Sequence, residues 1–498
     1  MVIIGSGLGG LVCGAILAKE GKRVCVLEKN EQIGGCLQTF KRDGVTFDTG
    51  VHYIGGLASS ENLWKIFNYL GIMERLETVR MDEKGFDVLL FKDDAQEYPY
   101  GMGYENFKAQ LLAQFPEEET AIVKYCADIQ RICDSVPLYN LRPEDDFGDN
   151  DGFTTGIKAY LENLTSNKKL QSVLGGTNLL YAGTDKTPLY IHALVVNSYI
   201  ESAFRIKGGG DNIAKLLART IKELDGDVLR KSEVKQIAVE DGNATYVELQ
   251  NGEQIHADLF ISGIHPSKTF ELTNTDALRP AYRNRIKGLE NSISTFVLYA
   301  VLKPGTFPYQ NRNYYYFNEN DVWQTGKYSE ETWPYMYALF EEVPYKPTGF
   351  AEAISIMTYM RFDEVEQWKA THHTTLDENI RAEAYQEFKT RKAEKLLDMV
   401  EIKFPGIRNC LQSYYTSTPL SYRDYMGTDD GSMYGIIKDV NEPMKSMISV
   451  KTKVPNLYLT GQNINLHGVL GVTECALLTC GAIIGKEYLL NKIKSVNA

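Results

Sequence analysis

The sequence predicts an α/β fold in which a Rossmann-like nucleotide-binding domain carries an inserted α+β domain. Three observations carry this prediction. Residues 2–4 form a short apolar run that leads into a glycine-rich turn and a helical pattern. A similar pattern, an extended run followed by a glycine-rich turn, recurs between residues 456 and 471. The 498 residues also exceed what one hydrophobic core usually holds.

The first element is a buried strand over residues 2–4, because three consecutive apolar side chains are typical of a parallel sheet. A helix over 8–19 follows, and Gly21 is its expected stop. A second strand over 23–28 completes a right-handed βαβ unit.

The middle of the chain alternates between helical and strand-like stretches. Apolar residues at spacings of three and four predict helical structure over 104–140, and helical character continues over 156–202. We expect this helical insert to form a cap over the substrate cavity. Further helices are predicted over 213–224 and 385–403, and strands over 233–239, 244–250, 258–262, 296–302, 314–318, 353–359 and 456–460. A last helix is expected over 472–491.

These elements divide into two discontinuous domains. The nucleotide-binding domain is predicted to comprise residues 1–80, 203–265 and 440–498, where the glycine-rich turns lie. The substrate-binding and helical cap domain takes residues 81–202 and 266–439.

Composition excludes several kinds of protein. A net charge of −12 without a basic cluster argues against nucleic-acid binding. Eight scattered cysteines without a CxxC pair indicate reduced thiols, and no paired ligands suggest a metal site. Met1 leads directly into a strand and Glu474 interrupts the longest apolar run, so we expect neither a signal peptide nor a membrane span. A cytoplasmic protein is predicted, with peripheral membrane contact as the other option.

Gly5, Gly7 and Gly10 have the GxGxxG spacing between the first strand and the first helix. Such glycines allow a tight turn, the approach of a pyrophosphate to the backbone, and close packing of helix on strand. Glu28 lies 23 residues after Gly5, where a carboxylate can bind ribose hydroxyls and would repel a 2′-phosphate. The Gly34-Gly35 turn and the second glycine-rich site at the C-terminus favour FAD, which is long enough to need both. A turn without chemical use is the alternative.

Four stretches carry a resemblance to a known family. "VIIGSGLGGLVCGAILAKEGKRVCVLEKNEQIGG" resembles the extended dinucleotide motif of amine-oxidase-like and phytoene-desaturase-like flavoproteins. "GGCLQTF…GVTFDTGVHYIGG" resembles the retinol saturase and carotenoid isomerase branch, most closely retinol saturase. "NLYLTGQNINLHGVLGVTECALLTCGAIIG" is similar to the closing flavin motif of that group. "FRIKGGGDNIAKLLARTIKELDGDVLRKSEVKQI" resembles the middle FAD segment of the family. The motifs thus lie at both ends of the chain and in its middle.

The resemblance implies a set of FAD contacts. Glu28 would hold the adenosine ribose, and a helix starting at Val472 would aim its dipole at the pyrimidine end of the flavin. Many relatives have a charged residue at the positions of Cys36 and Gln462. These two uncharged side chains therefore remove charge from the expected cofactor site. The full set of expected cofactor-binding residues is Gly5, Gly7, Gly10, Glu28, Lys29, Gly35, Cys36, Leu37, Val234, Gly461, Gln462, Gly468, Leu470, Gly471 and Val472.

Three residues are candidates for chemistry at the flavin. His52 and Tyr53 follow the Asp48-Thr49-Gly50 turn, and His467 precedes the last glycine-rich loop. A histidine could deliver a proton because its pKa lies near neutrality, or it could simply hold its loop by hydrogen bonds. Glu474 is expected to cap the last helix rather than to act as an acid. The aromatic runs around Tyr314 and Tyr335 fit either a lipid tunnel or a core.

The resemblance implies an FAD-dependent oxidoreductase that saturates or isomerises a C=C bond of an apolar polyene or isoprenoid-like lipid. The alternatives are a carotenoid desaturase, an amine oxidase, and a flavin- or lipid-binding protein without turnover. We find no second GxGxxG motif between a strand and a helix, so a separate electron donor or acceptor is expected.

Overall fold

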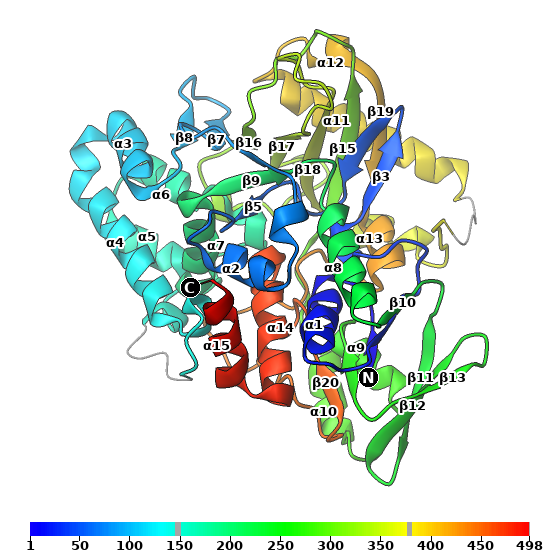
Figure 1. Ribbon diagram of the computed structural model, residues 1–498. Helices are drawn as coiled ribbons and strands as arrows, with labels where there is room; N and C mark the ends of the chain where they lie inside the picture. Colours follow the sequence, from blue (N-terminus) through cyan, green and yellow to red (C-terminus); the bar gives the residue numbers. More distant parts are fainter. Residues whose placement is uncertain (145–150, 376–380, 498) are drawn as a thin grey trace.

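A parallel sheet forms the base of the nucleotide-binding part in the computed structural model, which describes residues 1–144, 151–375 and 381–497 (Figure 1). Its five strands run in the order β10-β2-β1-β14-β20. Ile3 in the central strand pairs with Val26 on one side and Ile261 on the other, all in parallel register. The bounds are β1 Val2–Ile4, β2 Cys25–Leu27, β10 Asp227–Leu229, β14 Phe260–Ser262 and β20 Leu457–Leu459.

The two faces of this sheet are covered differently. Ile3, Val26 and Ile261 belong to the core beneath helices α1 (Leu8–Lys19), α8 (Asp211–Glu223) and α14 (Gly468–Ile484). Val2 and Ile4 point the other way, into the core against the three-stranded sheet of β11 (Val234–Glu240), β12 (Asn243–Leu249) and β13 (Gln254–His256). Because side chains alternate along a strand, the all-apolar strand β1 is buried on both sides, as the sequence predicts.

The C-terminal helix differs from its prediction. It starts at Gly468, four residues early, and ends at Ile484, and a separate helix α15 (Lys486–Val496) follows Gly485. Gly468 and Gly471 suggested a loop in the sequence. A Cβ atom on Gly471 would lie 2.5 Å from the Cβ atom of Leu466, so this glycine lets the first turn of the helix pack tightly instead.

A seven-stranded sheet dominates the second part, in the order β19-β15-β18-β17-β16-β7-β8 (top of Figure 1). The predicted strands near residues 296, 314 and 353 are confirmed, whereas β7, β8, β17 and β19 were not predicted. Tyr316 stacks on Tyr337 at 4.9 Å between ring centroids, and both rings are core residues rather than the wall of a tunnel. The bounds are β7 Asp87–Phe91, β8 Tyr98–Tyr100, β15 Ser294–Leu302, β16 Asn313–Phe317, β17 Met336–Glu341, β18 Ala353–Met360 and β19 Leu411–Ser417.

Helices cover one end of this sheet (left in Figure 1). The predicted helical stretch over 104–140 is broken near Pro116, since proline cannot continue a helix interior. The helices there are α3 Tyr104–Gln114, α4 Glu119–Ser135, α5 Ile157–Leu164, α6 Lys168–Gly175 and α7 Leu189–Glu201. The remaining elements are α2 Asn62–Tyr69, α9 Pro266–Leu272, α10 Pro280–Lys287, α11 Glu383–Glu401, α12 Ile407–Cys410, α13 Pro419–Met426, β3 Thr39–Arg42, β4 Val45–Asp48, β5 Ile54–Gly55, β6 Thr78–Arg80 and β9 Ala203–Ile206.

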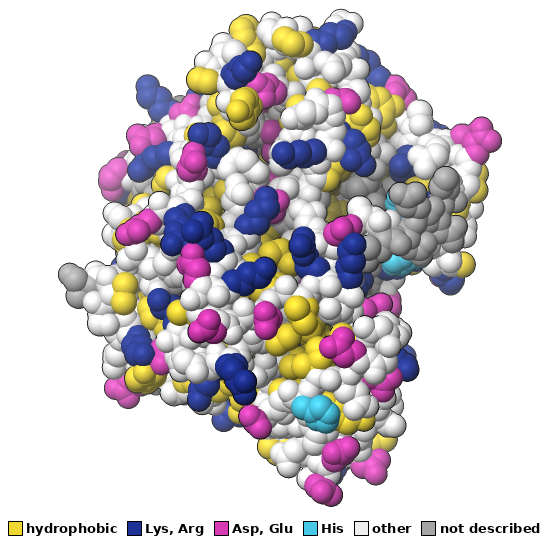
Figure 2. Space-filling view, turned by 45° about the vertical axis from the view of Figure 1, so that its right-hand side comes forward, with side chains coloured by type: hydrophobic (Ala, Val, Ile, Leu, Met, Phe, Trp, Pro, Cys, Tyr) yellow, Lys and Arg dark blue, Asp and Glu magenta, His cyan; other side chains and the backbone are white. Residues whose placement is uncertain are grey.

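The surface is mixed in charge. Figure 2 shows Lys and Arg side chains gathered across the middle of one face, with Asp and Glu side chains beside them and around its edge. Among the described residues, no helix is both long and apolar enough to cross a bilayer. All eight cysteines are free thiols.

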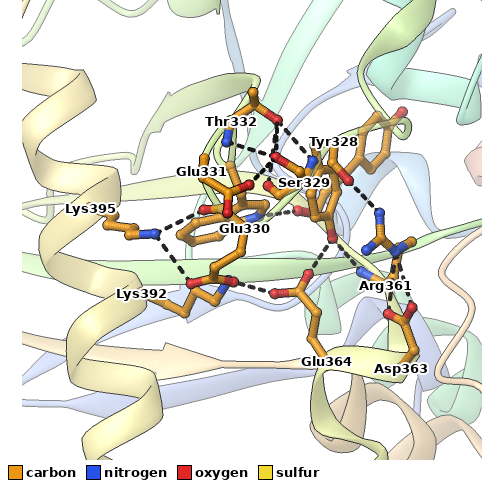
Figure 3. Close-up of polar contacts among 12 residues, drawn as sticks. Tyr328, Ser329, Glu330, Glu331, Thr332, Arg361, Asp363, Glu364, Lys392 and Lys395 are labelled. Atoms are coloured by element: carbon orange, nitrogen blue, oxygen red, sulfur yellow. Dashed lines mark hydrogen bonds and ion pairs between the residues drawn. The ribbon is translucent and has the colours of Figure 1, made fainter.

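A buried lysine on helix α11, Lys392, pairs with acidic residues from two other segments of the chain (Figure 3). The Lys392 side chain has no solvent-exposed surface, and its ammonium group lies 2.8 Å from Glu330 and 2.5 Å from Glu364. The same group sits 4.2 Å from the ring centre of Trp333. Lys395, one turn further along the helix, pairs with Glu330 at the surface. A buried cation with two carboxylates is costly to break, because one charge would be left unpaired.

We therefore predict that Lys392→Met lowers the free energy of unfolding by about 3 kcal/mol, since it leaves Glu364 without its cation. The matched variant Lys395→Met removes only an exposed pair and is expected to cost under about 1 kcal/mol. Urea unfolding of both variants measures the difference. Equal losses would contradict the assignment of Lys392 as the buried cation of these ion pairs.

Candidate active site

Two helices point their N-termini into one cleft of about 500 Å³. Gly7 precedes α1 and Gly468 begins α14, and both residues line the cleft. Neither helix has a side chain capping its N-terminus. The first N–H groups of a helix have no partner within the helix, and the helix dipole favours negative charge there. The cleft is therefore suited to a ligand with a phosphate group and a second electron-rich region.

Glycines make the close approaches that this cleft requires. A Cβ atom on Gly10 would lie 2.1 Å from the carbonyl oxygen of Gly5, so only glycine allows α1 to pack this closely on the turn after β1. Gly7, by contrast, has no atom within 4 Å of the place where a Cβ would stand, because that side faces the open cleft. The GxGxxG motif thus combines one packing position with one ligand-facing position.

Glu28 lies at the carboxyl end of β2 and lines the cleft. One carboxylate oxygen accepts hydrogen bonds from the Ser6 backbone N–H at 3.1 Å and the Ser6 hydroxyl at 2.5 Å. The other accepts from the Asn30 N–H at 2.9 Å. These bonds hold the side chain in place, and the free lone pairs can accept from ribose hydroxyls.

The neighbouring residues of β2 dock onto helix α13. Lys29 donates to the carbonyl of Asp424 at 3.0 Å, and Asn30 donates to that of Tyr425 at 3.0 Å. Burial lowers the pKa of Lys29. Cys36 lies 3.5 Å from the sulfur of Met426, and burial raises the pKa of its thiol to about 11, so it is neutral and unreactive.

The structure separates the expected cofactor contacts into two groups. Three of them do not line the main cleft: Gly10 packs beneath it, while Leu470 and Gly471 line a smaller cavity. The others line the main cleft: Gly5, Gly7, Glu28, Lys29, Gly35, Cys36, Leu37, Val234, Gly461, Gln462, Gly468 and Val472.

His52 and Tyr53 both point away from the main cleft. The His52 ring is buried and stacks on Phe340 at 4.4 Å, and its nearest charge is Glu342 at 3.7 Å. Neither ring nitrogen of His52 has a hydrogen-bond partner. Tyr53 donates to Asp87 at 2.8 Å and lies 2.6 Å from the Tyr315 hydroxyl. Both residues stabilise their loop: His52 by stacking on Phe340, and Tyr53 through its buried hydrogen bonds.

His467 and Glu474 line the smaller cavity, of about 50 Å³. His467 is the residue before α14, and its ring lies 4.9 Å from that of Tyr434, which lines the main cleft. The expectation that Glu474 caps α14 is wrong, because the helix starts at Gly468 and places Glu474 in its second turn. Its carboxyl is buried with one oxygen unpartnered, and burial raises its pKa to about 8.

Sequence reasoning missed most of one set of cleft-lining residues, the aromatic and methionine wall. This wall consists of Tyr422, Tyr425 and Met426 on α13 together with Met433 and Tyr434. No spacing signal marks such residues, because they reach the cleft from a segment about 400 positions after the first glycine turn.

The residues present fit a dinucleotide flavin. Gly7, Gly35 and Gly461 offer backbone to a diphosphate, Glu28 offers a carboxylate to a ribose, and Gly468 and Val472 place the N-terminus of α14 at the aromatic end. A flavin held there would supply two-electron transfer at its ring. The side chains of the aromatic and methionine wall would exclude water from that end and orient an apolar substrate.

We predict that Gly7→Ala and Gly10→Ala separate binding from folding. Gly7→Ala should leave the melting temperature of the flavin-free protein unchanged but weaken FAD at least about tenfold, because its methyl group enters the cleft. Gly10→Ala should destabilise the protein itself by about 1–3 kcal/mol, because its methyl group meets the Gly5 carbonyl. Flavin fluorescence titration and thermal unfolding measure both effects. A destabilised Gly7→Ala protein with normal FAD affinity would contradict this division.

Known proteins are similar to this chain in sequence and in fold. The flavin containing amine oxidoreductase family matches residues 8–484. All-trans-retinol 13,14-reductase of Homo sapiens is 27% identical over 546 residues, covering 100% of this chain and 87% of that protein. The chloroplastic prolycopene isomerase of Daucus carota is 24% identical, covering 93% and 76%. A crystal structure of an oxidoreductase from Methanosarcina mazei superposes with a TM-score of 0.63 at 16% identity, covering 96% and 98%.

These similarities confirm the expected family, the α/β fold class and the cofactor. The geometry of the cleft agrees with these similarities, because two uncapped helix N-termini and the anchored Glu28 carboxylate surround a space for a dinucleotide. The chain belongs to the flavin-containing amine oxidoreductase family and is an FAD-dependent oxidoreductase.

Proposed function

We propose that this protein reduces a C=C bond of an apolar polyene or isoprenoid-like lipid. The observation that carries the proposal is the full-length similarity to the human retinol 13,14-reductase. The aromatic and methionine wall agrees with such a substrate, because Met433 and Tyr434 offer apolar and aromatic surface near the N-terminus of α14.

Reduction of a C=C bond needs a hydride at one carbon and a proton at the other. A bound reduced flavin would supply the hydride, and the chain must orient the double bond and provide the proton. His467 is the predicted catalytic residue that lies nearest to the cleft wall, through its contact with Tyr434. His52 and Tyr53 stay candidates for support of the loop beside the flavin.

The electrons come from a separate donor in this proposal. The N-terminal GxGxxG motif lines the flavin cleft, and the sequence has no second one for a nicotinamide dinucleotide. A cytoplasmic location with peripheral contact to the membrane that holds the lipid completes the proposal.

Isomerisation is the second candidate function. The similarity to the carrot prolycopene isomerase, over 93% of this chain, favours it. An isomerase returns both electrons, so its product has the mass of the substrate, whereas a reductase adds two hydrogens. Desaturation would remove two hydrogens, and amine oxidation would release peroxide.

Anaerobic turnover distinguishes these reactions. The protein is loaded with FAD, reduced with dithionite, and mixed with all-trans-retinol and a panel of longer polyenes, and the products are weighed by mass spectrometry. We expect a product heavier by two hydrogens, formed only with the reduced protein. A product of unchanged mass would support isomerisation instead. Bound FAD with no product from any polyene would contradict both and leave a binding protein.

A further inference from the structure

Glu474 is a buried acid that the flavin site leaves without a function. Glu474 is 2% exposed, and its Oε1 atom has no hydrogen-bond partner. A buried carboxyl group without partners is costly, and native structures retain few of them. Glu474 lies on α14, the helix whose N-terminus faces the flavin cleft, two turns or less from that end.

The cavity beside Glu474 holds a second unpartnered polar atom. Nε2 of His467 is buried and lacks a hydrogen bond, and both side chains line the same space of about 50 Å³. A water molecule needs roughly 10–15 Å³ of such space and two or more polar partners. The cavity therefore has room for a few water molecules that bridge the Glu474 carboxyl and the His467 ring.

The first turn of α14 separates this cavity from the flavin cleft. Gly468 and Val469 line both spaces, so the wall between them is a single turn of helix. At its start, the His467 ring meets the ring of Tyr434, which belongs to the cleft. A proton taken up by His467 from the cavity is thus next to the place where the substrate lies.

We propose that Glu474 stores the proton for C=C reduction and that His467 carries it from the small cavity to the flavin cleft. This inference rests on the proposed function. In the balanced reaction, reduced flavin gives a hydride to one alkene carbon, and the other carbon gains a proton that leaves Glu474 as a carboxylate. Flavin is oxidised, the alkene is reduced, and water returns a proton to Glu474.

The pKa values of the surrounding groups agree with Glu474 as the proton store and His467 as the proton carrier. Burial raises the pKa of Glu474 to about 8, so the group is protonated at neutral pH and gives up its proton readily. The other acids of the cleft wall near α14 are far weaker, since burial raises the pKa of Tyr422 to about 12 and raises that of Tyr434 well above its usual range. Burial and Lys438 lower the pKa of His467 to about 4, so it passes a proton on without retaining it.

No cation among the described residues lining the cavity offsets the charge of an ionised Glu474. The titratable groups that face it are Cys133 from α4, Tyr139 from the turn after α4, Tyr199 from α7 and His467 from its own helix end. Burial raises the pKa of Cys133, Tyr139 and Tyr199, which keeps all three neutral. The ionised carboxylate is therefore short-lived and favours prompt reprotonation.

Single-turnover reduction across about pH 6–9.5 tests the role of Glu474 around its pKa. The wild-type rate is expected to fall above about pH 8, as Glu474 loses its proton. Glu474→Gln should be slower by roughly 10²–10⁴-fold and should lack this alkaline limb, and Glu474→Asp should recover part of both. The control Glu201→Gln changes a nearby acid on α7 that does not line the cavity, and it should keep the wild-type rate and profile.

A second measurement does not depend on turnover. The infrared difference between the wild-type protein and Glu474→Gln should contain the carbonyl band of one neutral carboxylic acid, and this band should disappear with an apparent pKa near 8. Other buried acids, such as Asp87 with its raised pKa, contribute to both proteins and cancel in the difference. If Glu474→Gln keeps the wild-type rate and alkaline limb, this inference is overturned and the proposed function stands. If the wild-type protein reduces no polyene, both are overturned.

The same carboxyl makes stability depend on pH. Its pKa is raised in the folded protein, so the folded state holds a proton that the unfolded state releases above about pH 4.5. Its contribution is therefore full below about pH 4.5 and is lost as the pH rises towards 8. We expect the melting temperature of the wild type to fall relative to that of Glu474→Gln over this range. A constant difference between the two would show that Glu474 is already ionised in the folded protein.

Discussion

The structure depends on two uncapped helix N-termini that meet in one cleft. Helix α1 comes from the start of the chain and α14 from its end, and they pack against each other over the same parallel sheet. Each presents unpaired N–H groups and the positive end of its dipole. A long ligand with phosphates at one part and an electron-rich ring at another satisfies both ends at once. The inserted sheet and helices then close the cleft around the ring.

The parts of the fold with a strict backbone requirement were predictable from the sequence. The strand, glycine turn and helix over residues 2–19 follow from apolar runs and from glycines that leave no room for a side chain, such as Gly10. The start of α14 was missed because Gly468 and Gly471 have poor helix propensity, and tertiary packing against Leu466 overrides it. That error of four residues also gave Glu474 the wrong role.

The site was predictable on one side only. Residues near the glycine motifs could be placed by their spacing, whereas Tyr422, Met426 and Tyr434 reach the cleft through tertiary folding that no local pattern records. His52 illustrates the opposite error. It follows a promising turn, but its ring stacks on Phe340 behind the loop. A residue close in sequence to a cofactor motif can still point away from the cofactor.

A stoichiometric titration shows whether the reduced flavin of this protein gives its electrons to a C=C bond. The reduced, FAD-loaded protein is titrated with a polyene in the absence of oxygen, and the return of the visible band of oxidised flavin is followed together with loss of the polyene. The account predicts that flavin is reoxidised in step with the polyene, with each flavin consuming a single double bond. A flavin that stays reduced with excess polyene but is promptly reoxidised by oxygen would contradict it.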